Sequence, residues 1–259
     1  MSSVSIYTLA SGSSGNCTYL KLGEAEFLID AGVSRREIAR KLAELGTSLD
    51  KIAAIFVTHE HSDHIKGIEM IAKYDRIPIF GAKPSLSVMT RVDPTLLHPI
   101  RQNESVTLKD ATITPFKTWH DSLASYGYVA SYEGLSFGYC TDLGRPSDEV
   151  TDALVGCRAV ILEANYDSDM LKYGDYPPFL KSRIAGEFGH LSNDVSAKFA
   201  AFLAKCGTER ILLAHLSKEN NTPEKAYTAV SEYLKKESLA PSLSVADRYG
   251  ITELITISC

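Results

Sequence analysis

Four side chains that commonly bind metal ions lie within six consecutive positions of the sequence, in the stretch VTHEHSDHIKG at residues 57–67. They are His59, His61, Asp63 and His64. Neutral imidazole and carboxylate groups are the usual protein ligands of zinc and similar divalent ions. Crowding such groups together without a counter-ion would be costly. The cluster therefore predicts a metal site. Its H-x-H-x-D-H spacing can supply ligands to two adjacent ions, but four ligands are too few for both, so the others must come from elsewhere in the chain.

Further candidate ligands are scattered along the rest of the chain. His120, His215 and Asp142 each end an apolar run, a position typical of the junction between a strand and a loop. A carboxylate at Asp142 can bridge two ions about 3.5–4 Å apart, and such a pair polarises a phosphoryl or carbonyl oxygen and activates a shared water. His98, beside Pro99 on an expected loop, is predicted to bind no metal.

The composition is that of a globular protein with an acidic balance. The chain has 259 residues, of which 44% are hydrophobic, enough for a sizeable core. Its net charge of −5 excludes a strongly basic surface, so nucleic-acid binding would need a local basic patch or a metal. The sequence shows neither a signal-peptide pattern nor a run of eighteen apolar residues, so we expect a cytoplasmic protein that does not associate with a membrane.

The cysteines show no pairing pattern. None belongs to a C-x-x-C pair and their number is odd, which argues against a disulfide framework and against a thiolate zinc site. We therefore expect reduced and mostly buried thiols at Cys17, Cys140, Cys157, Cys206 and Cys259.

Hydrophobic patterns place the histidine cluster between a strand and a helix. Short apolar or alternating runs predict strands at residues 4–10, 17–23 and 25–32. An amphipathic helix follows at residues 34–46, with Ser34 as its N-cap and Gly46 at its end. Residues 51–59 predict a strand buried on both faces, and residues 65–74 predict a helix. The cluster thus lies on the loop between these two elements.

The second half of the chain continues the alternation. Short strands are predicted at residues 105–110, 111–119, 126–134 and 135–142, as an antiparallel sheet that turns at Glu133-Gly134. Buried strands are predicted at residues 159–165 and 210–217, with a helix at residues 195–206 and Asn193 near its cap. A last helix opens at Thr222-Pro223. Since no repeat or linker interrupts the chain, we expect one domain, residues 1–259, with two sheets between helical layers.

The full set of candidate ligands resembles that of the metallo-β-lactamase superfamily of binuclear hydrolases, and the resemblance extends across the whole chain. It implies an α/β fold, an αββα sandwich of two mixed β-sheets flanked by helices, with the metal site at one edge. It also implies two divalent metal ions, Zn²⁺, Mn²⁺ or Fe²⁺. The first would be held by His59, His61 and His120, and the second by Asp63, His64 and His215, with Asp142 as the bridge. Asp30 in LIDAG matches a structural aspartate near the site.

Several segments narrow the resemblance. LASGSSGNCTYL, LEANYD, YPPFLKSRIAGEFGHLSN and HLSKENNTPE resemble the bacterial YycJ (WalJ) group, implicated as metal-dependent 5′-to-3′ DNA exonucleases. GHLSN and AHLS are similar to the paired histidine segments of ribonuclease Z-like phosphodiesterases. The partner implied is DNA with a 5′ phosphate end, and Asp63 is then counted among the catalytic residues. Tyr166 departs from the resemblance, because many relatives carry His there.

Candidates for the proton donor and the substrate contacts lie outside the ligand set. His190, just before a predicted helix N-terminus, is a candidate general acid or phosphate contact, and Glu163 either orients it or caps a strand. Residues 173–183 combine aromatic rings with basic side chains, which suits stacking on bases, or they form a solvated loop. Residues 11–16 (SGSSGN) either present N–H groups to a phosphate or form a hairpin turn. The candidate substrate contacts are Ser14, Asn16, Lys181, Arg183, Ser192 and Asn193.

Three functions remain open at this level. The first is a metal-dependent nuclease acting on DNA. The second keeps the metal site but acts on a small molecule, such as a lactone, a thioester or a cyclic phosphodiester, as the acidic composition favours. The third is a regulatory protein of cell-wall signalling with little catalysis, against which the complete ligand set argues. The sequence indicates no oligomeric state.

Overall fold

Two seven-stranded β-sheets form the centre of the computed structural model, which describes residues 3–258. The first sheet has the order β14-β1-β2-β3-β4-β5-β6. Its strands are β1 (Ser3–Ala10), β2 (Cys17–Leu22), β3 (Ala25–Ile29), β4 (Ile52–Phe56), β5 (Ile79–Ala82), β6 (Leu97–Ile100) and β14 (Thr252–Ser258). Strands β14, β1, β2 and β3 pair antiparallel, whereas β3 to β6 pair parallel, so the sheet is mixed.

The second sheet has the order β13-β12-β11-β10-β9-β8-β7. Its strands are β7 (Val106–Leu108), β8 (Ala111–Lys117), β9 (Tyr126–Tyr132), β10 (Leu135–Cys140), β11 (Ala159–Glu163), β12 (Arg210–Ala214) and β13 (Ser242–Val245). Strands β7 to β10 form the predicted antiparallel part, and the predicted turn between β9 and β10 is confirmed, since Glu133 and Gly134 both have positive φ. Strands β10 to β13 are parallel.

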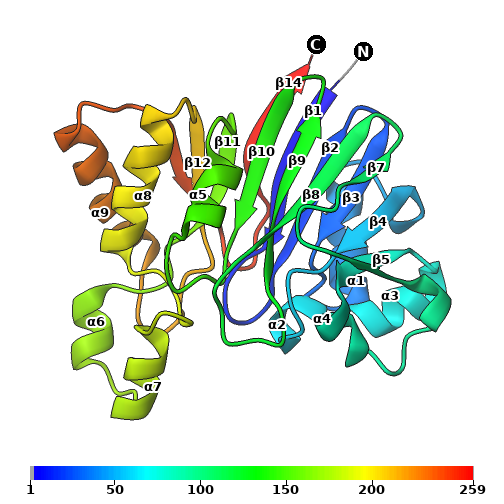
Figure 1. The fold of residues 1–259 in the computed structure, drawn as a ribbon, viewed down its shortest axis with the longest axis horizontal. Coiled ribbons are helices and arrows are strands. Elements are labelled where there is room, and N and C mark those ends of the chain that lie inside the picture. Colours follow the sequence, from blue (N-terminus) through cyan, green and yellow to red (C-terminus); the bar gives the residue numbers. More distant parts are fainter. Residues whose placement is uncertain (1–2, 259) are drawn as a thin grey trace.

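Helices cover the outer face of each sheet (Figure 1). Helices α1 (Arg35–Glu44), α3 (Ile68–Asp75) and α4 (Lys83–Ser87) bury their apolar faces against the first sheet. Helices α5 (Asp148–Leu154), α8 (Asn193–Lys205) and α9 (Pro223–Lys236) do so against the second. A third apolar core, with Phe27, Phe56 and Tyr128, fills the space between the sheets. This arrangement confirms the predicted αββα sandwich.

Three further short helices complete the architecture. Helix α2 (Ser62–Ile65) follows β4, and helices α6 (Ser168–Tyr173) and α7 (Pro178–Ile184) extend beyond the second sheet (Figure 1). Two 3₁₀ turns, Leu49–Lys51 and Pro94–Leu96, precede β4 and β6. Among residues 3–258 no helix is long and apolar enough to cross a membrane.

The helix starts follow the sequence signals closely. The Ser34 hydroxyl accepts from the Glu37 backbone N–H at 3.2 Å and caps α1, as predicted. The Thr222 hydroxyl accepts from the Lys225 backbone N–H at 3.2 Å and caps α9, which has Pro223 in its first turn. The cap of α8 is Ser192, and Asn193, expected near the cap, is the first residue of the helix.

Several expectations about individual segments are wrong. The helix predicted at residues 65–74 is confirmed as α3 from Ile68 onward, but its start is wrong, because Ile65 ends α2. Gly67 separates the two helices, and its N–H donates to the Ala31 carbonyl at 2.7 Å. His98 lies in strand β6 instead of a loop, and its ring stacks on Phe80 with centroids 4.9 Å apart. Residues 173–183 are largely helical, because α7 begins after Pro177. Strands β5, β6, β13 and β14 and helices α4 to α6 were not predicted.

The thiols agree with the prediction as far as the structure describes them. Cys17, Cys140 and Cys157 are buried, Cys206 is half-buried, and all four are free. Burial raises the pKa of Cys157 to about 12, as for a thiol without an activating cation. Cys259 lies outside the described residues.

Candidate metal centre and catalytic site

The predicted ligands meet at one edge of the sandwich, where strands from both sheets end. His59 follows β4 in the first sheet, whereas His120, Asp142 and His215 follow β8, β10 and β12 in the second. Because neighbouring parallel strands end at the same edge, the sheet topology brings these distant residues together. The short helix α2 adds Asp63 and His64 at this edge.

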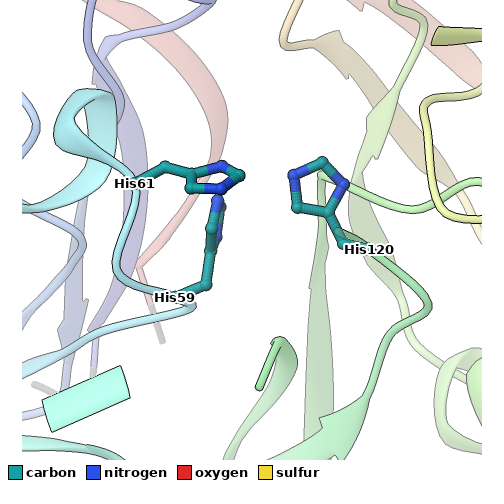
Figure 2. Close-up of side chains that lie close together, drawn as sticks. All are labelled: His59, His61 and His120. Carbon is teal, nitrogen blue, oxygen red and sulfur yellow. The ribbon is translucent and has the colours of Figure 1, made fainter. Parts of the chain in front are cut away.

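His59, His61 and His120 form a first group of candidate ligands. Each offers one nitrogen, and these nitrogens lie within 4.8 Å of one another. Figure 2 shows the three rings turned toward a common point, two from one loop and the third from the facing segment. Glu60, between the first two histidines, points elsewhere and accepts from the Leu123 backbone N–H at 2.7 Å. This contact ties the two loops that carry the group.

Asp63, His64 and His215 form a second group, whose ligand atoms also lie within 4.8 Å of one another. Asp142 lies beside both groups. Its Oδ2 is 3.4 Å from His64 Nε2, and its Oδ1 is 3.6 Å from His120 Nε2 and 3.5 Å from His215 Nε2. The structure therefore brings together all seven of the predicted ligands.

The polar atoms that face this space fit a divalent cation. His59 Nε2, His215 Nε2 and Asp142 Oδ2 are buried and have no hydrogen-bond partner among the described residues. Buried polar atoms are normally hydrogen-bonded, so unpaired atoms within these two groups fit coordination of a cation. Burial also holds the pKa of His59 well below its usual range, which favours the neutral imidazole that binds metals. Nitrogen and carboxylate oxygen donors suit Zn²⁺, Mn²⁺ and Fe²⁺ alike.

Asp30 supports the second group from behind. Its buried carboxylate lies 2.7 Å from His64 Nδ1 and accepts from the Thr58 backbone N–H at 2.8 Å. A carboxylate on one ring nitrogen fixes the tautomer that leaves the other nitrogen free for a metal. The structural role expected for Asp30 therefore has a defined partner.

Glu163 joins two histidines of the site. Its Oε1 lies 2.8 Å from His190 Nδ1 and 2.9 Å from His215 Nδ1, and its Oε2 accepts from the backbone N–H groups of Leu143 and Leu191. Burial alone would raise its pKa, but the two histidines lower the pKa of Glu163 to about 2. Because both oxygens are occupied, Glu163 orients its neighbours and is not itself a free ligand.

A cavity of about 260 Å³ opens over these groups. Ligands of both groups, Asp142 and His190 line its floor, and Tyr176, Leu180 and Arg183 from the α7 region form one wall. Ser13 lies in the lining, whereas the predicted Ser14 does not. The cavity therefore presents the candidate ligands and a partly exposed imidazole to the same space.

Arg183 is the predicted substrate contact that lines this cavity, and the remaining ones do not line it. Asn16 is buried, with its amide 3.1 Å from His64 Nε2, in the loop that joins β1 and β2 as a hairpin. Lys181 donates to the Lys172 carbonyl at 2.9 Å, on the side of α7 that does not line the cavity. Ser192 caps α8, and Asn193 exchanges hydrogen bonds of 2.9 Å with Asn221.

Asp121 is a site residue that sequence reasoning missed. Its Oδ1 lies 3.4 Å from His120 Nε2, and its Oδ2 accepts a hydrogen bond from the Arg183 guanidinium. Its position directly after His120 was the only signal available. Tyr166, by contrast, is buried outside the cavity lining and pairs with Ser192 through the backbone.

Comparisons with known proteins agree with this geometry. Residues 25–216 match the family model described as the beta-lactamase superfamily domain. Exodeoxyribonuclease WalJ of Streptococcus pneumoniae serotype 2 (strain D39) is 34% identical over 237 residues, which cover 89% of this chain and 88% of that protein. Exodeoxyribonuclease YycJ of Bacillus anthracis is 31% identical over 235 residues, which cover 88% of each chain.

A solved structure shows the same fold at much lower identity. The metallo-beta-lactamase fold protein YhfI from Bacillus subtilis superposes with a TM-score of 0.75 at 16% identity, covering 98% of this chain and 100% of that chain. The chain belongs to the metallo-β-lactamase superfamily of metal-dependent hydrolases, and within it to the group that contains the WalJ and YycJ proteins.

Proposed function

We propose that this chain is a 5′-to-3′ exodeoxyribonuclease that works with two divalent metal ions, Zn²⁺, Mn²⁺ or Fe²⁺. The observation that carries the proposal is the pair of ligand groups, which share Asp142 on the floor of one cavity beside His190. A carboxylate between two ligand sets is the arrangement expected of a two-metal phosphodiesterase. The names of the two similar relatives, both exodeoxyribonucleases, support DNA as the substrate.

The ligands divide between two ions in this proposal. His59, His61 and His120 would hold one ion, Asp63, His64 and His215 the other, and Asp142 both. When bound, the ions supply Lewis acidity at the phosphoryl oxygens and lower the pKa of water to near neutrality. The protein supplies the fixed orientation of the ligands, through contacts such as Asp30 with His64 and Glu163 with His215.

His190 is the candidate proton donor. Its Nδ1 donates to Glu163 Oε1 at 2.8 Å, so its Nε2 is left for the cavity that it lines. Phosphodiester hydrolysis produces an alkoxide leaving group, which departs more easily when it receives a proton. In the proposal, protonated His190 gives the Nε2 proton to the leaving oxygen, and Glu163 keeps the ring aligned.

Arg183 is the candidate contact for a terminal phosphate. It lies on the α7 wall of the cavity, and its hydrogen bond to Asp121 holds it next to the His120 loop. A guanidinium can bind phosphate oxygens through two N–H groups at once. An end-directed enzyme needs such a contact, because it must distinguish a 5′ phosphate from an internal one.

The proposal is tested with purified protein, Mn²⁺ and 5′-labelled single- and double-stranded DNA. We expect release of labelled mononucleotides by the metal-loaded protein and at least a hundredfold loss of rate in Asp63→Ala and His61→Ala. Asp75→Ala is the control. It removes a carboxylate that pairs with Arg35 at 2.6 Å and is not among the ligands, so this variant should keep its activity. Labelled fragments longer than a mononucleotide as first products would contradict exonuclease action from the 5′ end.

A small-molecule hydrolase is the second candidate. The modest cavity of about 260 Å³ and the net charge of −5 favour it, since both suit a small substrate better than a long polyanion. Turnover of a lactone, a thioester or a cyclic phosphodiester, together with no release of nucleotides from DNA, would select this candidate.

A further inference from the structure

An aromatic and basic cluster lies beside the metal centre and has no part in the mechanism above. The rings of Trp119 and Phe188 have centroids 5.4 Å apart and planes inclined by 33°. The Arg145 guanidinium lies 4.4 Å from the Trp119 ring centroid, and the Lys117 ammonium lies 5.2 Å from it. We call Lys117, Trp119, Arg145 and Phe188 the Trp119 cluster.

Three of the four residues share a loop with a residue of the site. Trp119 directly precedes His120, Arg145 follows Asp142 by three positions, and Phe188 precedes His190 by two. Consecutive Cα atoms are about 3.8 Å apart, so each of these three residues lies one to three residue lengths along the chain from a residue that lines the cavity. The same three loops therefore carry the site on one side and the cluster on the other.

Backbone contacts hold these loops together. The Gly144 N–H donates to the Trp119 carbonyl at 2.8 Å, and the Asp121 N–H donates to the Phe188 carbonyl at 3.0 Å. The approach at Gly144 is so close that a Cβ there would lie 2.1 Å from the Glu187 carbonyl oxygen. The position of the cluster relative to the metal centre is therefore fixed by the fold.

Most of the cluster is exposed to solvent. Phe188 is 50% exposed, Lys117 and Arg145 are exposed, and Trp119 is half-buried. Both cations lie near the Trp119 ring, and their charges also help to lower the pKa of Glu149. In a protein with a net charge of −5, two exposed cations next to aromatic rings are a local exception.

We infer that the Trp119 cluster is a binding site for single-stranded DNA, in which a base stacks on the aromatic rings and the adjoining phosphate contacts Arg145 and Lys117. Aromatic rings interleaved with cations are the usual means of binding single strands without sequence preference. The inference rests on the proposed nuclease function, and it adds the surface that holds the strand beside the scissile phosphate.

Trp119 is the only tryptophan of the chain, so its fluorescence reports on the cluster directly. The metal-loaded protein is titrated with a 5′-phosphorylated phosphorothioate oligo-dT, which resists hydrolysis. Binding is followed both by tryptophan emission and by the anisotropy of a dye on the oligonucleotide. We expect saturable quenching of Trp119 with the same midpoint as the anisotropy change, and a weaker affinity at higher salt.

Two variants and two matched controls complete the test. Phe188→Ala and Arg145→Ala should each weaken oligo-dT binding about tenfold, the usual scale for one stacking partner. The first control, Phe202→Ala, removes a partly exposed ring from α8. The second, Arg210→Ala, removes an exposed cation at the start of β12, at the opposite end of the strand from His215. Both controls should bind oligo-dT like the unmodified protein. Unchanged thermal unfolding shows that each variant is folded.

The outcomes separate this inference from the proposed function. Oligonucleotide binding with unchanged Trp119 emission, and with Phe188→Ala and Arg145→Ala binding normally, overturns the inference and leaves the nuclease proposal standing. A protein that neither binds oligo-dT nor hydrolyses DNA with Mn²⁺ overturns the nuclease proposal, and the inference falls with it.

Discussion

At the scale of residues, the site depends on carboxylates that hold histidines in one orientation. Asp30 contacts His64 Nδ1, and Glu163 contacts the Nδ1 atoms of both His190 and His215. Because a carboxylate accepts from Nδ1, the Nε2 atom of each ring carries a free lone pair when the imidazole is neutral. The carboxylates thus fix the orientation and the tautomer of these histidines.

Asp30→Asn should weaken metal binding while the fold is kept. The substitution is nearly isosteric, but an amide cannot replace both the acceptor for Thr58 N–H and the charge beside His64. Loss of such a supporting partner typically lowers metal affinity about 10–100-fold. Competition with a chromophoric chelator measures the affinity. Asp75→Asn is the control, and equal affinities in the two variants would refute a supporting role for Asp30.

Glu163→Gln should impair proton delivery more than metal-assisted attack. The amide group cannot accept from both histidines, so His190 loses its alignment, and general acid catalysis contributes about 10²–10⁴-fold. The rate on DNA should fall on that scale, whereas a 4-nitrophenyl phosphodiester should lose much less, because nitrophenolate leaves without a proton. Steady-state rates on both substrates measure the difference. Equal losses of rate on DNA and on the nitrophenyl substrate would argue against His190 as the proton donor. Glu209→Gln is the control, because Glu209 is exposed and pairs with Arg158.

At the scale of elements, sharp turns after strands aim the site residues. Asp30, Asp142 and His215 follow β3, β10 and β12, and their φ values are 60°, 57° and 57°. A left-handed conformation is unfavourable for residues other than glycine, so the surrounding contacts must maintain it. The His215 N–H donates to the Ser11 hydroxyl at 2.8 Å, and the Asp30 N–H donates to the Phe56 carbonyl at 2.9 Å.

Gly32→Ala should disrupt the loop junction that places Asp63. A Cβ at Gly32 would lie 1.6 Å from the Asp63 carbonyl oxygen, so the backbone must move. Overpacking of this kind costs roughly 1–3 kcal/mol or more. We expect a lower midpoint of thermal unfolding together with weaker metal binding. Gly46→Ala is the control: its φ of 76° makes alanine unfavourable, but nothing lies within 4 Å, so it should cost about 1 kcal/mol and leave metal binding intact.

At the scale of the whole molecule, the metal centre joins the two halves of the sandwich. The loop and short helix α2 after β4 of the first sheet supply His59, His61, Asp63 and His64. Loops after strands of the second sheet supply His120, Asp142 and His215. The last strand, β14, returns to pair with β1 in the first sheet, after β13 has paired in the second. The chain thus returns from the second sheet to the first, which ties the two sheets together. On this basis we propose that residues 1–259 form one cooperative domain.

Removal of metal should lower the stability of the whole chain in a single transition. A ligand at about 1,000 times its Kd stabilises the native state by roughly 4 kcal/mol, which corresponds to roughly 8–16 °C for a chain of this size. Thermal unfolding followed by circular dichroism, with and without a chelator, measures the shift. Two separate transitions in the metal-free protein would contradict a single domain, and an unchanged midpoint would contradict metal binding by the native state.

The sequence by itself determined the chemistry of the ligands and the elements with strong local patterns. Four of the ligands, His59, His61, Asp63 and His64, lie within six consecutive positions. Elements β1 to β4, α1 and α9 carry periodic runs and caps that depend on neighbouring residues alone. Strands β5, β6, β13 and β14 were not predicted, and their places in the sheets are set by pairing with distant strands.

Only the tertiary structure decided which polar residues face the cavity. Ser13 lines it and Ser14 does not, Arg183 lines it and Lys181 does not, although each pair is adjacent or nearly so in sequence. Asp121 and the Trp119 cluster likewise lie beside the metal centre because the fold brings their loops to one edge. The direction of a loop side chain depends on packing against segments far along the chain, and no local pattern records it.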